Sequence, residues 1–390
     1  VMYSTAGTKT ITLTVTNNGT CPATITQTIT INQTPTASFS STAPSCTGSN
    51  VDFTNTGTTT AVTWLWNFGS GAAPATSTVQ NPTAITYSTS GTKSVTLTTT
   101  NSTSGCNATA MQTINISQTP APAFTSTAPQ CTGNAVAFNY TGTTGTGWTY
   151  NWDFGTGATP ALSSAQNPPN VIYSTAGTKT ITLTVTNNGT CPATITQTIT
   201  INQTPTASFS SNTPACTADS VSFLNTGTVT GVTWLWNFGS GAAPATSTVQ
   251  NPTGITYSTS GTKSVTLTVT NTTSSCTATA MQTINISQTP APAFTSTAPQ
   301  CQGASVTFNY TGTTGLGWTY NWDFGTGATP ALSSAQNPPS VMYATAGTKT
   351  ITLTVTNDIC SKAITQTITI NSLPVVVTGP GCGPVRDEVT

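Results

Sequence analysis

The chain repeats itself at a fixed period, and this limits what it can fold into more than any other feature. Residues 1–41 return at 171–211 with one change, Met2 against Ile172, and the same motif starts again at Val341. Each period holds two related units of about 85 residues, marked by the aromatic runs beginning at Trp64 and Tyr150. In a tandem array of this kind, function belongs to length and surface more than to one pocket.

The composition argues against several classes of function. Charged residues make up 4% of the chain, basic and acidic side chains cancel, and there is no histidine. A nucleic-acid surface needs clustered Lys and Arg, and acid–base catalysis needs titratable groups. No apolar run approaches the roughly 18–20 residues of a spanning helix. We therefore predict no nucleic-acid partner, no membrane insertion, no enzymatic activity, and no metal or other cofactor.

Short alternating segments predict strands throughout. In Thr10–Thr16 the apolar residues take every odd position and threonine takes the others, which is the pattern of a half-buried strand. Six or seven such strands in about 85 residues, separated by Gly/Pro/Ser/Thr turns, indicate an antiparallel β-sandwich. The predicted fold class is all-β, a tandem array of immunoglobulin-like sandwiches forming an elongated rod.

Period-2 spacing places most aromatic residues on one face, where a core needs them, rather than on a carbohydrate-stacking platform. The expected core aromatics are Trp64, Trp66, Phe68, Trp152, Phe154, Trp234, Trp236 and Trp322. One lysine recurs in the G-T-K corner of every module, and we expect it to be exposed at a strand end, where it opposes edge pairing. Asp153 and Asp323 are expected to stabilise turns rather than to bind calcium.

These residues also carry a family resemblance. The run W-[ND]-F-G-x-G, then Asn-Pro, then Tyr, then G-T-K-x-[VI]-T-L-T-x-T-N resembles the polycystic kidney disease (PKD) domain, an immunoglobulin-like sandwich. The family's loop often reads W-D-F-G-D-G, whereas here the second acid is replaced by Ser70, Thr156, Ser240 or Thr326. The Cys-bearing, Thr-rich variant is similar to arrays in giant surface adhesins of Bacteroidota.

The period divides the chain into modules. We expect the C-terminal part of a PKD-like module at 1–33, whole PKD-like modules at 34–118, 119–203, 204–288 and 289–372, and the start of a further Ig-like module at 373–390. Short proline-containing linkers such as 117–122 predict stiff junctions. We expect the chain to be a segment of a longer protein.

The ten cysteines follow the period and predict disulfides in an oxidising compartment. Pairing within a module joins Cys46 to Cys106, but those positions lie at opposite ends of a sandwich, about 25–35 Å apart, whereas a disulfide needs Cα atoms within about 7 Å. The favoured hypothesis is therefore pairing between adjacent modules; intra-module pairing and pairing across the 25-residue gap remain alternatives. The favoured pairs are Cys46–Cys191, Cys131–Cys276 and Cys216–Cys360.

The leading hypothesis for function is a structural segment of a long extracellular filament or cell-surface adhesin stalk, projecting a tip or bearing force. Its partners are neighbouring modules of the same chain, with surface glycans, a host or a substratum reached through a tip outside this sequence. The alternative is a PKD-like binding or spacer array of a secreted polysaccharide- or protein-degrading enzyme. A third hypothesis is lateral self-association into a fibre, because little charge protects the strand edges.

Overall fold

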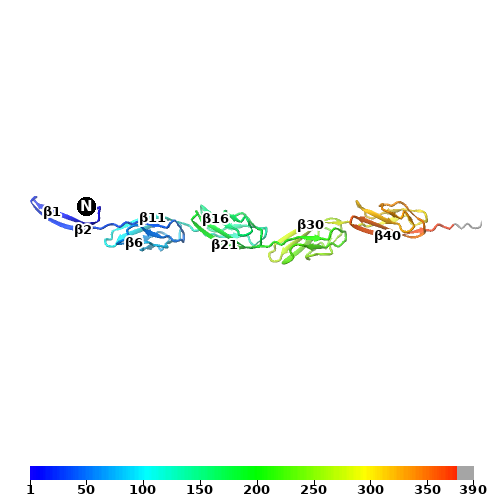
Figure 1. Cartoon of the computed structure of the whole chain (residues 1–390), viewed down its shortest axis with the longest axis horizontal. Coiled ribbons are helices and arrows are strands. Elements are labelled where there is room, and N and C mark those ends of the chain that lie inside the picture. Colours follow the sequence, from blue (N-terminus) through cyan, green and yellow to red (C-terminus); the bar gives the residue numbers. More distant parts are fainter. Residues whose placement is uncertain (376–390) are drawn as a thin grey trace, which may run out of the picture. The chain divides into compact units, whose positions relative to one another are not determined.

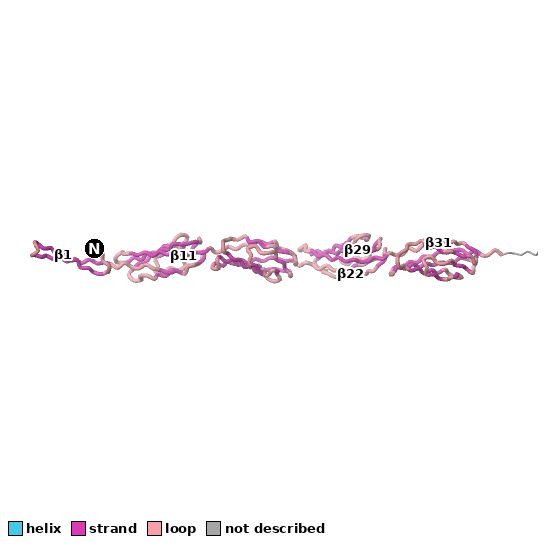
Figure 2. Tube along the Cα trace, turned by 90° about the horizontal axis from the view of Figure 1, so that it is seen from above, coloured by secondary structure: helices cyan, strands magenta, loops and turns pink. Residues whose placement is uncertain are grey.

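A computed structural model of the chain describes residues 1–375. Its regular structure is entirely β, and strands and loops account for all of the described residues (Figure 2). The chain divides into two compact units, Val1–Gln203 and the part from Thr204 onward, and each is described by itself. Figure 1 shows every module as its own group of strands.

The first unit opens with a hairpin of two long strands, β1 (Gly7–Asn17) and β2 (Cys21–Ile31). They pair antiparallel from Gly7↔Ile31 to Asn17↔Cys21 and form a two-stranded sheet. The threonines and apolar residues alternate along both strands, so the hairpin has one threonine face and one apolar face.

A complete module follows within 34–118. Its main sheet has the order β4-β11-β10-β6-β8, and the smaller pairs β3-β5 and β7-β9 belong to the opposite layer of the sandwich. The strands are β3 (Phe39–Ser41), β4 (Ser45–Cys46), β5 (Phe53–Asn55), β6 (Val62–Asn67), β7 (Ala72–Ala73), β8 (Thr76–Ser77), β9 (Thr86–Tyr87), β10 (Gly91–Asn101) and β11 (Asn107–Ser117).

The second complete module, within 119–203, repeats this plan with the main sheet β13-β21-β20-β16-β18. The pair β12-β15 and the three-stranded sheet β14-β19-β17 accompany it. The strands are β12 (Phe124–Ser126), β13 (Gln130–Cys131), β14 (Ala135–Val136), β15 (Phe138–Tyr140), β16 (Trp148–Asp153), β17 (Ala158–Thr159), β18 (Leu162–Ser163), β19 (Val171–Tyr173), β20 (Gly177–Asn187) and β21 (Cys191–Asn202).

The second unit contains the same two module types. Within 204–288 the strands are β22 (Phe209–Ser211), β23 (Ala215–Cys216), β24 (Phe223–Asn225), β25 (Val232–Asn237), β26 (Ala242–Ala243), β27 (Thr246–Ser247), β28 (Thr256–Tyr257), β29 (Gly261–Asn271) and β30 (Thr277–Ser287). Within 289–372 they are β31 (Phe294–Ser296), β32 (Gln300–Cys301), β33 (Ser305–Val306), β34 (Phe308–Tyr310), β35 (Thr319–Asp323), β36 (Ala328–Thr329), β37 (Leu332–Ser333), β38 (Val341–Tyr343), β39 (Gly347–Asn357) and β40 (Cys360–Asn371). The main sheets are β23-β30-β29-β25-β27 and β32-β40-β39-β35-β37.

Each module has its own core around one tryptophan, which lies on the strand next to one edge of the main sheet: β6, β16, β25 or β35. In module 119–203, Trp152 meets Phe124 edge-on at 5.1 Å between ring centroids and stacks on Phe154 at 5.7 Å. Its indole nitrogen donates to the Ala165 carbonyl at 2.9 Å, so the ring is buried without leaving its polar atom unpaired. Of the predicted core aromatics, these are fully buried: Trp66, Phe68, Trp152, Phe154, Trp236 and Trp322. Trp64 and Trp234 are partly buried and pack against their cores.

A buried tyrosine fixes the loop after the tryptophan-bearing strand. Tyr173 donates from its hydroxyl to the Phe154 carbonyl at 2.9 Å. Burial, and to a smaller extent the Asp153 carboxylate, raises the pKa of Tyr173 to about 12. Burial alone likewise raises the pKa of its equivalents Tyr87, Tyr257 and Tyr343 to about 12.

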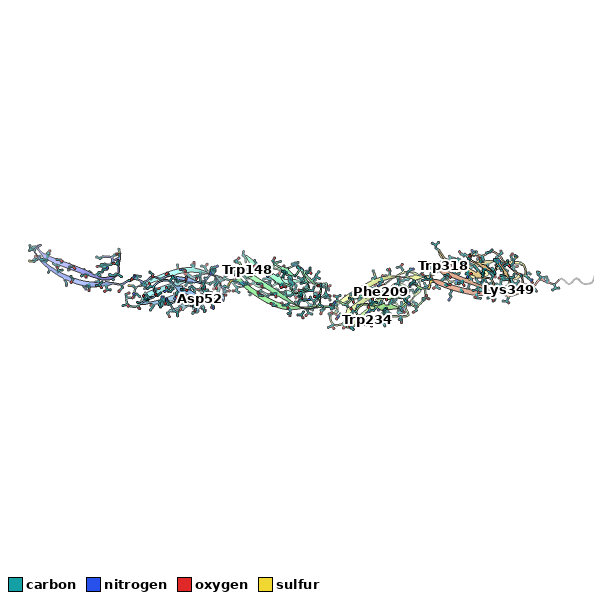
Figure 3. The ribbon with its side chains drawn as sticks, in the orientation of Figure 1. Asp52, Trp148, Phe209, Trp234, Trp318 and Lys349 are labelled. Atoms are coloured by element: carbon teal, nitrogen blue, oxygen red, sulfur yellow. A yellow bond between two sulfur atoms is a disulfide. The ribbon has the colours of Figure 1, made fainter. Side chains whose placement is uncertain are left out.

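The expectation that the G-T-K lysines are exposed is wrong in the four complete modules. Lys93, Lys179, Lys263 and Lys349 are all buried (Figure 3 labels Lys349). Lys179 donates to the Thr175 hydroxyl at 2.8 Å, and its Nζ lies 5.8 Å from the centroid of the Tyr173 ring. The side chain thus covers the core tyrosine with its apolar stem and places its charge over the ring face.

The predicted start of a further module at 373–390 lies outside the described residues from 376 onward, as does Cys382. Within residues 1–375 no helix is long and apolar enough to cross a membrane.

Candidate functional site

The most constrained feature outside the cores is the junction between adjacent modules of one unit, where a disulfide joins them. Cys46 bonds to Cys191 with a Cα–Cα distance of 5.8 Å, and Cys216 bonds to Cys360 at 5.9 Å. The structure therefore brings together two of the three favoured pairs. The alternative Cys46–Cys106 pairing is wrong, because Cys46 is already bonded and Cys106 is a free thiol.

The first half of the junction is built at the C-terminal end of a module. Cys46 lies on the short strand β4, which pairs in parallel with the end of β11 through Ser117↔Cys46. The backbone nitrogen of Thr47 then donates to the Ser117 carbonyl at 2.8 Å. Cys46 is thereby held beside the point where the chain leaves the module.

The second half is the tip of a long hairpin. Between β20 and β21 the chain turns through Asn188 and Gly189, whose φ values of 47° and 77° are in the left-handed region that Asn and Gly tolerate. The backbone nitrogen of Thr190 donates to the Asn187 carbonyl at 3.0 Å and closes the turn. Cys191 opens β21 directly after this turn and is 1% exposed.

Side-chain hydrogen bonds hold the linker between the two halves. Thr119 donates two hydrogen bonds to Thr47. Its backbone nitrogen donates to the Thr47 hydroxyl at 2.9 Å, and its own hydroxyl donates to the Thr47 carbonyl at 2.8 Å. From the other module, the Asn187 amide donates to the Gln118 carbonyl at 2.8 Å. The linker is thus bonded to both modules it connects.

The second unit repeats this arrangement. Thr289 bonds to Thr217 through its backbone nitrogen at 3.0 Å and its hydroxyl at 2.8 Å. The Asn357 amide donates to the Gln288 carbonyl at 3.1 Å. Because the same contacts recur in separate modules, the junction is a property of the repeat and not of one position in the chain.

Sequence reasoning did not identify these polar contacts. The string S-Q-T-P at both junctions and the strand-end dipeptide T-N at Asn187 and Asn357 carry them, but these residues are typical of a linker and a turn. Only the folded module shows that the asparagine which begins the turn also reaches the neighbouring linker. Cys131 and Cys276, the third favoured pair, are disulfide-bonded as well, and their pairing with each other stays a prediction.

In the part of the chain that the structure describes, few side chains outside the junctions could bind a metal or a ligand. No cluster of three or more potential metal ligands occurs there. The Asp153 carboxylate accepts a hydrogen bond from the Gly155 backbone at 2.8 Å, as expected for a turn-forming side chain. The tryptophans are all buried or half-buried; Trp148 and Trp318, labelled in Figure 3, pack against their module cores.

Comparison with known families gives one clear result. The profile of the PKD domain matches four times, at residues 32–116, 117–201, 202–286 and 287–372. The matches begin two residues before each of the expected whole modules. No curated protein sequence matches the chain with significance.

Solved structures resemble the chain only distantly. The extracellular domain of protocadherin gamma-B4 has 12% identity, covering 94% of this chain and 72% of its own, with a TM-score of 0.25. An ectodomain fragment of ICAM-5 has 10% identity, covering 87% and 100%, with a TM-score of 0.36. A Ca²⁺-stabilised adhesin described as helping an Antarctic bacterium to reach out and bind ice has 12% identity, covering 83% and 93%, with a TM-score of 0.26.

Proposed function

Because this chain belongs to the PKD domain family, with four domains in tandem, we propose that it is a non-catalytic structural segment of a long extracellular filament or cell-surface adhesin stalk. Its task would be to project a tip from the cell or to transmit force. The Cys-bearing, Thr-rich character of the modules favours the type found in giant Bacteroidota adhesins. Disulfides at regular positions support an oxidising, extracellular location.

The observation that carries this proposal is the position of the disulfides relative to a pulling force. Cys46 and Cys191 are 145 residues apart in sequence but are joined directly. Tension applied along the chain passes from Cys46 to Cys191 through the sulfur atoms, so the residues between them are outside the load path. The Cys216–Cys360 bond, with a separation of 144, removes a second long segment from the path.

The arrangement protects the cores in which the modules' stability resides. The shielded segment 47–190 contains most of one module, including Trp66, and strands β12 to β20 of the next, including Trp152. Pulling on a sandwich without such a bond separates its terminal strands and exposes the core. In this chain the load bypasses these strands, which suits a segment whose role is to stay folded under tension.

Single-molecule pulling on the 390-residue chain tests the proposal. After reduction, each module of about 85 residues is expected to unfold with a length gain of roughly 250–300 Å. In the oxidised chain, the free segment from Thr34 to Cys46 releases at most roughly 45 Å, so the long steps from the shielded modules disappear. The double variant Cys46→Ser/Cys191→Ser should restore long steps in the first unit without reductant. Full-length steps in the oxidised wild-type chain would refute the force-bearing role.

A further inference from the structure

The last long strand of each complete module is paired along the whole of one side but only at the end of the other. β11 pairs with β10 from Gly91↔Ile116 to Thr100↔Asn107. On its other side it pairs with β4 at Ile116 and Ser117, and residues 107–115 meet no strand there within the described chain. β21, β30 and β40 meet short strands in the same way. We call residues 107–115 of β11 and 277–285 of β30 the open edges of their modules.

The hydrogen-bond pattern shows which backbone groups of β11 point to its open edge. The Ser117 carbonyl accepts from the backbone nitrogen of Thr47, next to β4, and therefore points away from β10. The Cys106 carbonyl accepts from the backbone nitrogen of Asn101 and points toward β10. Successive residues of a strand direct their backbone groups to opposite sides. The residues that direct N–H and C=O to the open edge are therefore Asn107, Thr109, Met111, Thr113 and Asn115.

β11 and β30 have none of the features by which natural sheets oppose pairing at an edge. Such features are charged side chains, proline, bulges and very short strands. Both strands are 11 residues long, contain no charge and no proline, and pair with their neighbours without a bulge. The other two strands are protected: β21 carries Pro192, and β40 carries Lys362 on its core-facing side, opposite Val355. The open edges of β11 and β30 are thus the least protected of the four.

An exposed methionine lies at the centre of each open edge. Met111 is 69% exposed and Met281 is 70% exposed, and both side chains are on the outer face of the main sheet. At the same position the two other complete modules have threonine, Thr196 and Thr365. A large apolar side chain gains free energy when a neighbour covers it. The methionine therefore occurs in the two modules whose edge is least protected.

We propose that the open edge of β11 or β30 pairs antiparallel with the open edge of β11 or β30 in a second copy of this chain. The two strands differ only at their first residue, Asn107 against Thr277, so either can serve. The register is centred on Met111, because β4 occupies the edge beyond residue 115 and only this register pairs every free residue. It places Met111 opposite Met111, Thr109 opposite Thr113 and Asn107 opposite Asn115. The facing residues exchange backbone hydrogen bonds, and the two methionines contact each other on the outer face.

The chemistry of the edge favours a second copy over another occupant. β11 has no charge, so it offers a charged strand no counter-charge, and it can oppose itself without like-charge repulsion. A second copy brings an edge of equal length whose own N–H and C=O groups are also unpaired, and one contact covers both edges. Each chain carries two such edges, which permits lateral association of more than two copies. The inference does not rest on the force-bearing role proposed above.

Sedimentation equilibrium of the 390-residue chain, from micromolar to millimolar concentration, tests the proposal. All samples carry Cys21→Ser, Cys106→Ser, Cys301→Ser and Cys382→Ser, so that disulfides between copies do not enter the readout. We expect the mass to rise with concentration from 39.6 kDa toward its multiples. Met111→Pro/Met281→Pro removes the N–H at the centre of both edges without touching a bond to β10, and should keep the chain monomeric. A chain that is monomeric at every concentration before this change would overturn the proposal.

Two further variants separate edge pairing from packing of the outer faces. Met111→Lys/Met281→Lys keeps the backbone unchanged but places like charges opposite each other at the centre of the pair, and should also abolish association. Leu65→Lys/Leu235→Lys is the matched control, because these leucines are 54% and 53% exposed on the same face, two strands from the open edge. It should leave association intact. Equal loss in the leucine variant, or association that survives both methionine variants, would refute edge pairing. Unchanged calorimetric transitions show that each variant is folded.

Hydrogen exchange locates the contact directly. Peptides that cover residues 107–115 and 277–285 should exchange more slowly as concentration rises, because the edge-facing amides become bonded. Peptides that cover β6 and β25 should exchange at the same rate throughout. If the mass rises while exchange at the open edges stays constant, another surface joins the copies and the proposal is wrong.

Discussion

The same sequence occurs twice in the first unit and meets two environments. The hairpin of β1 and β2 and the hairpin of β20 and β21 share their residues, and the pairs Leu13↔Ile25 and Leu183↔Ile195 have the same register. Yet Leu13 is 58% exposed and Leu183 is 0% exposed. Strand pairing and the turn are therefore local properties of the sequence, whereas burial is supplied by the rest of the module.

The cysteines show the same contrast. Cys21 is free and exposed, while Cys191 is buried in a disulfide with Cys46. The turn has the same geometry in both places, and within the described residues only the tip of the second hairpin lies beside a partner cysteine, Cys46. Because the two hairpins share their sequence, each substitution in the second hairpin has a matched control at the same position of the first.

Removal of the inter-module disulfide should have the largest effect. The Cys46–Cys191 bond closes a loop with a separation of 145 residues, and chain entropy assigns such a loop about 5 kcal/mol, with measured losses commonly about 2–5 kcal/mol. We expect Cys46→Ser/Cys191→Ser to lower the unfolding transitions of both joined modules in scanning calorimetry. Cys21→Ser, the same change on the free hairpin, should leave all transitions in place; an equal loss in both variants would contradict the comparison.

Leu13 and Leu183 occupy the same position in the two hairpins, but truncation to alanine should destabilise a module only at Leu183. Leu183→Ala removes a fully buried side chain from the core of module 119–203 and should cost about 2–5 kcal/mol. At roughly 4–8 °C per kcal/mol for a domain of this size, one calorimetric transition should fall by more than about 10 °C. Leu13→Ala should change no module's transition, because Leu13 belongs to no core cluster; a comparable shift would mean that the hairpin packs on a module in solution.

A third difference between a module core and the first hairpin concerns how stability depends on pH. Tyr173 is buried with a pKa of about 12, whereas an unfolded chain has a tyrosine pKa of about 10. The folded pKa is the higher one, so its contribution is complete below pH 10 and is lost as pH rises from 10 to 12, by an amount on the order of 2 kcal/mol. Denaturation midpoints of the chain should therefore fall over this range.

Tyr173→Phe should remove the part of this slope that belongs to module 119–203, although the change also leaves the Phe154 carbonyl without its donor. Tyr3→Phe is the same change at the equivalent position of the first hairpin, outside every core cluster, and serves as the control. If the midpoints are flat between pH 10 and 12, the tyrosines are not buried in solution.

The choice of cysteine partners at the junction could be predicted because it depends on strands and turns formed by residues close in sequence. The alternation of threonine with apolar residues fixes which face of β20 is buried, and the turn through Asn188 and Gly189 fixes where its tip lies. Once strand direction is known, Cys46 and Cys106 must lie at opposite ends of one module, so the choice of partner follows from distance. Each step uses only neighbours in sequence and the geometry of a sandwich.

The unpredicted contacts depend on surfaces that meet only after folding. The G-T-K motif gives no sign that Lys179 will lie over the ring of Tyr173, because the apolar stem and the ring come from different strands. In the same way, Asn187 reads as a turn residue, and its bond to the Gln118 carbonyl needs the next module in place. Trp64 follows the same alternation as Trp66 but is only half-buried, a difference that the alternation does not predict.

The smallest predicted effect concerns one position where the modules differ. On the strand after the G-T-K corner, Val185, Val269 and Val355 are fully buried, but module 34–118 has Thr99 there. Its hydroxyl is buried without a hydrogen-bond partner. A buried hydroxyl without a partner costs about 1–2 kcal/mol, so Thr99→Val should stabilise this module by that amount and raise its transition by several degrees.

Module 204–288 supplies the natural reference, because Val269 faces Trp234 there as Thr99 faces Trp64. The reciprocal change, Val269→Thr, should destabilise module 204–288 by a similar amount. Val15→Thr in the exposed hairpin should cost no module any stability, since water can bond the new hydroxyl. If Thr99→Val has no effect, an ordered water satisfies the Thr99 hydroxyl, and this position no longer distinguishes a module core from a free hairpin.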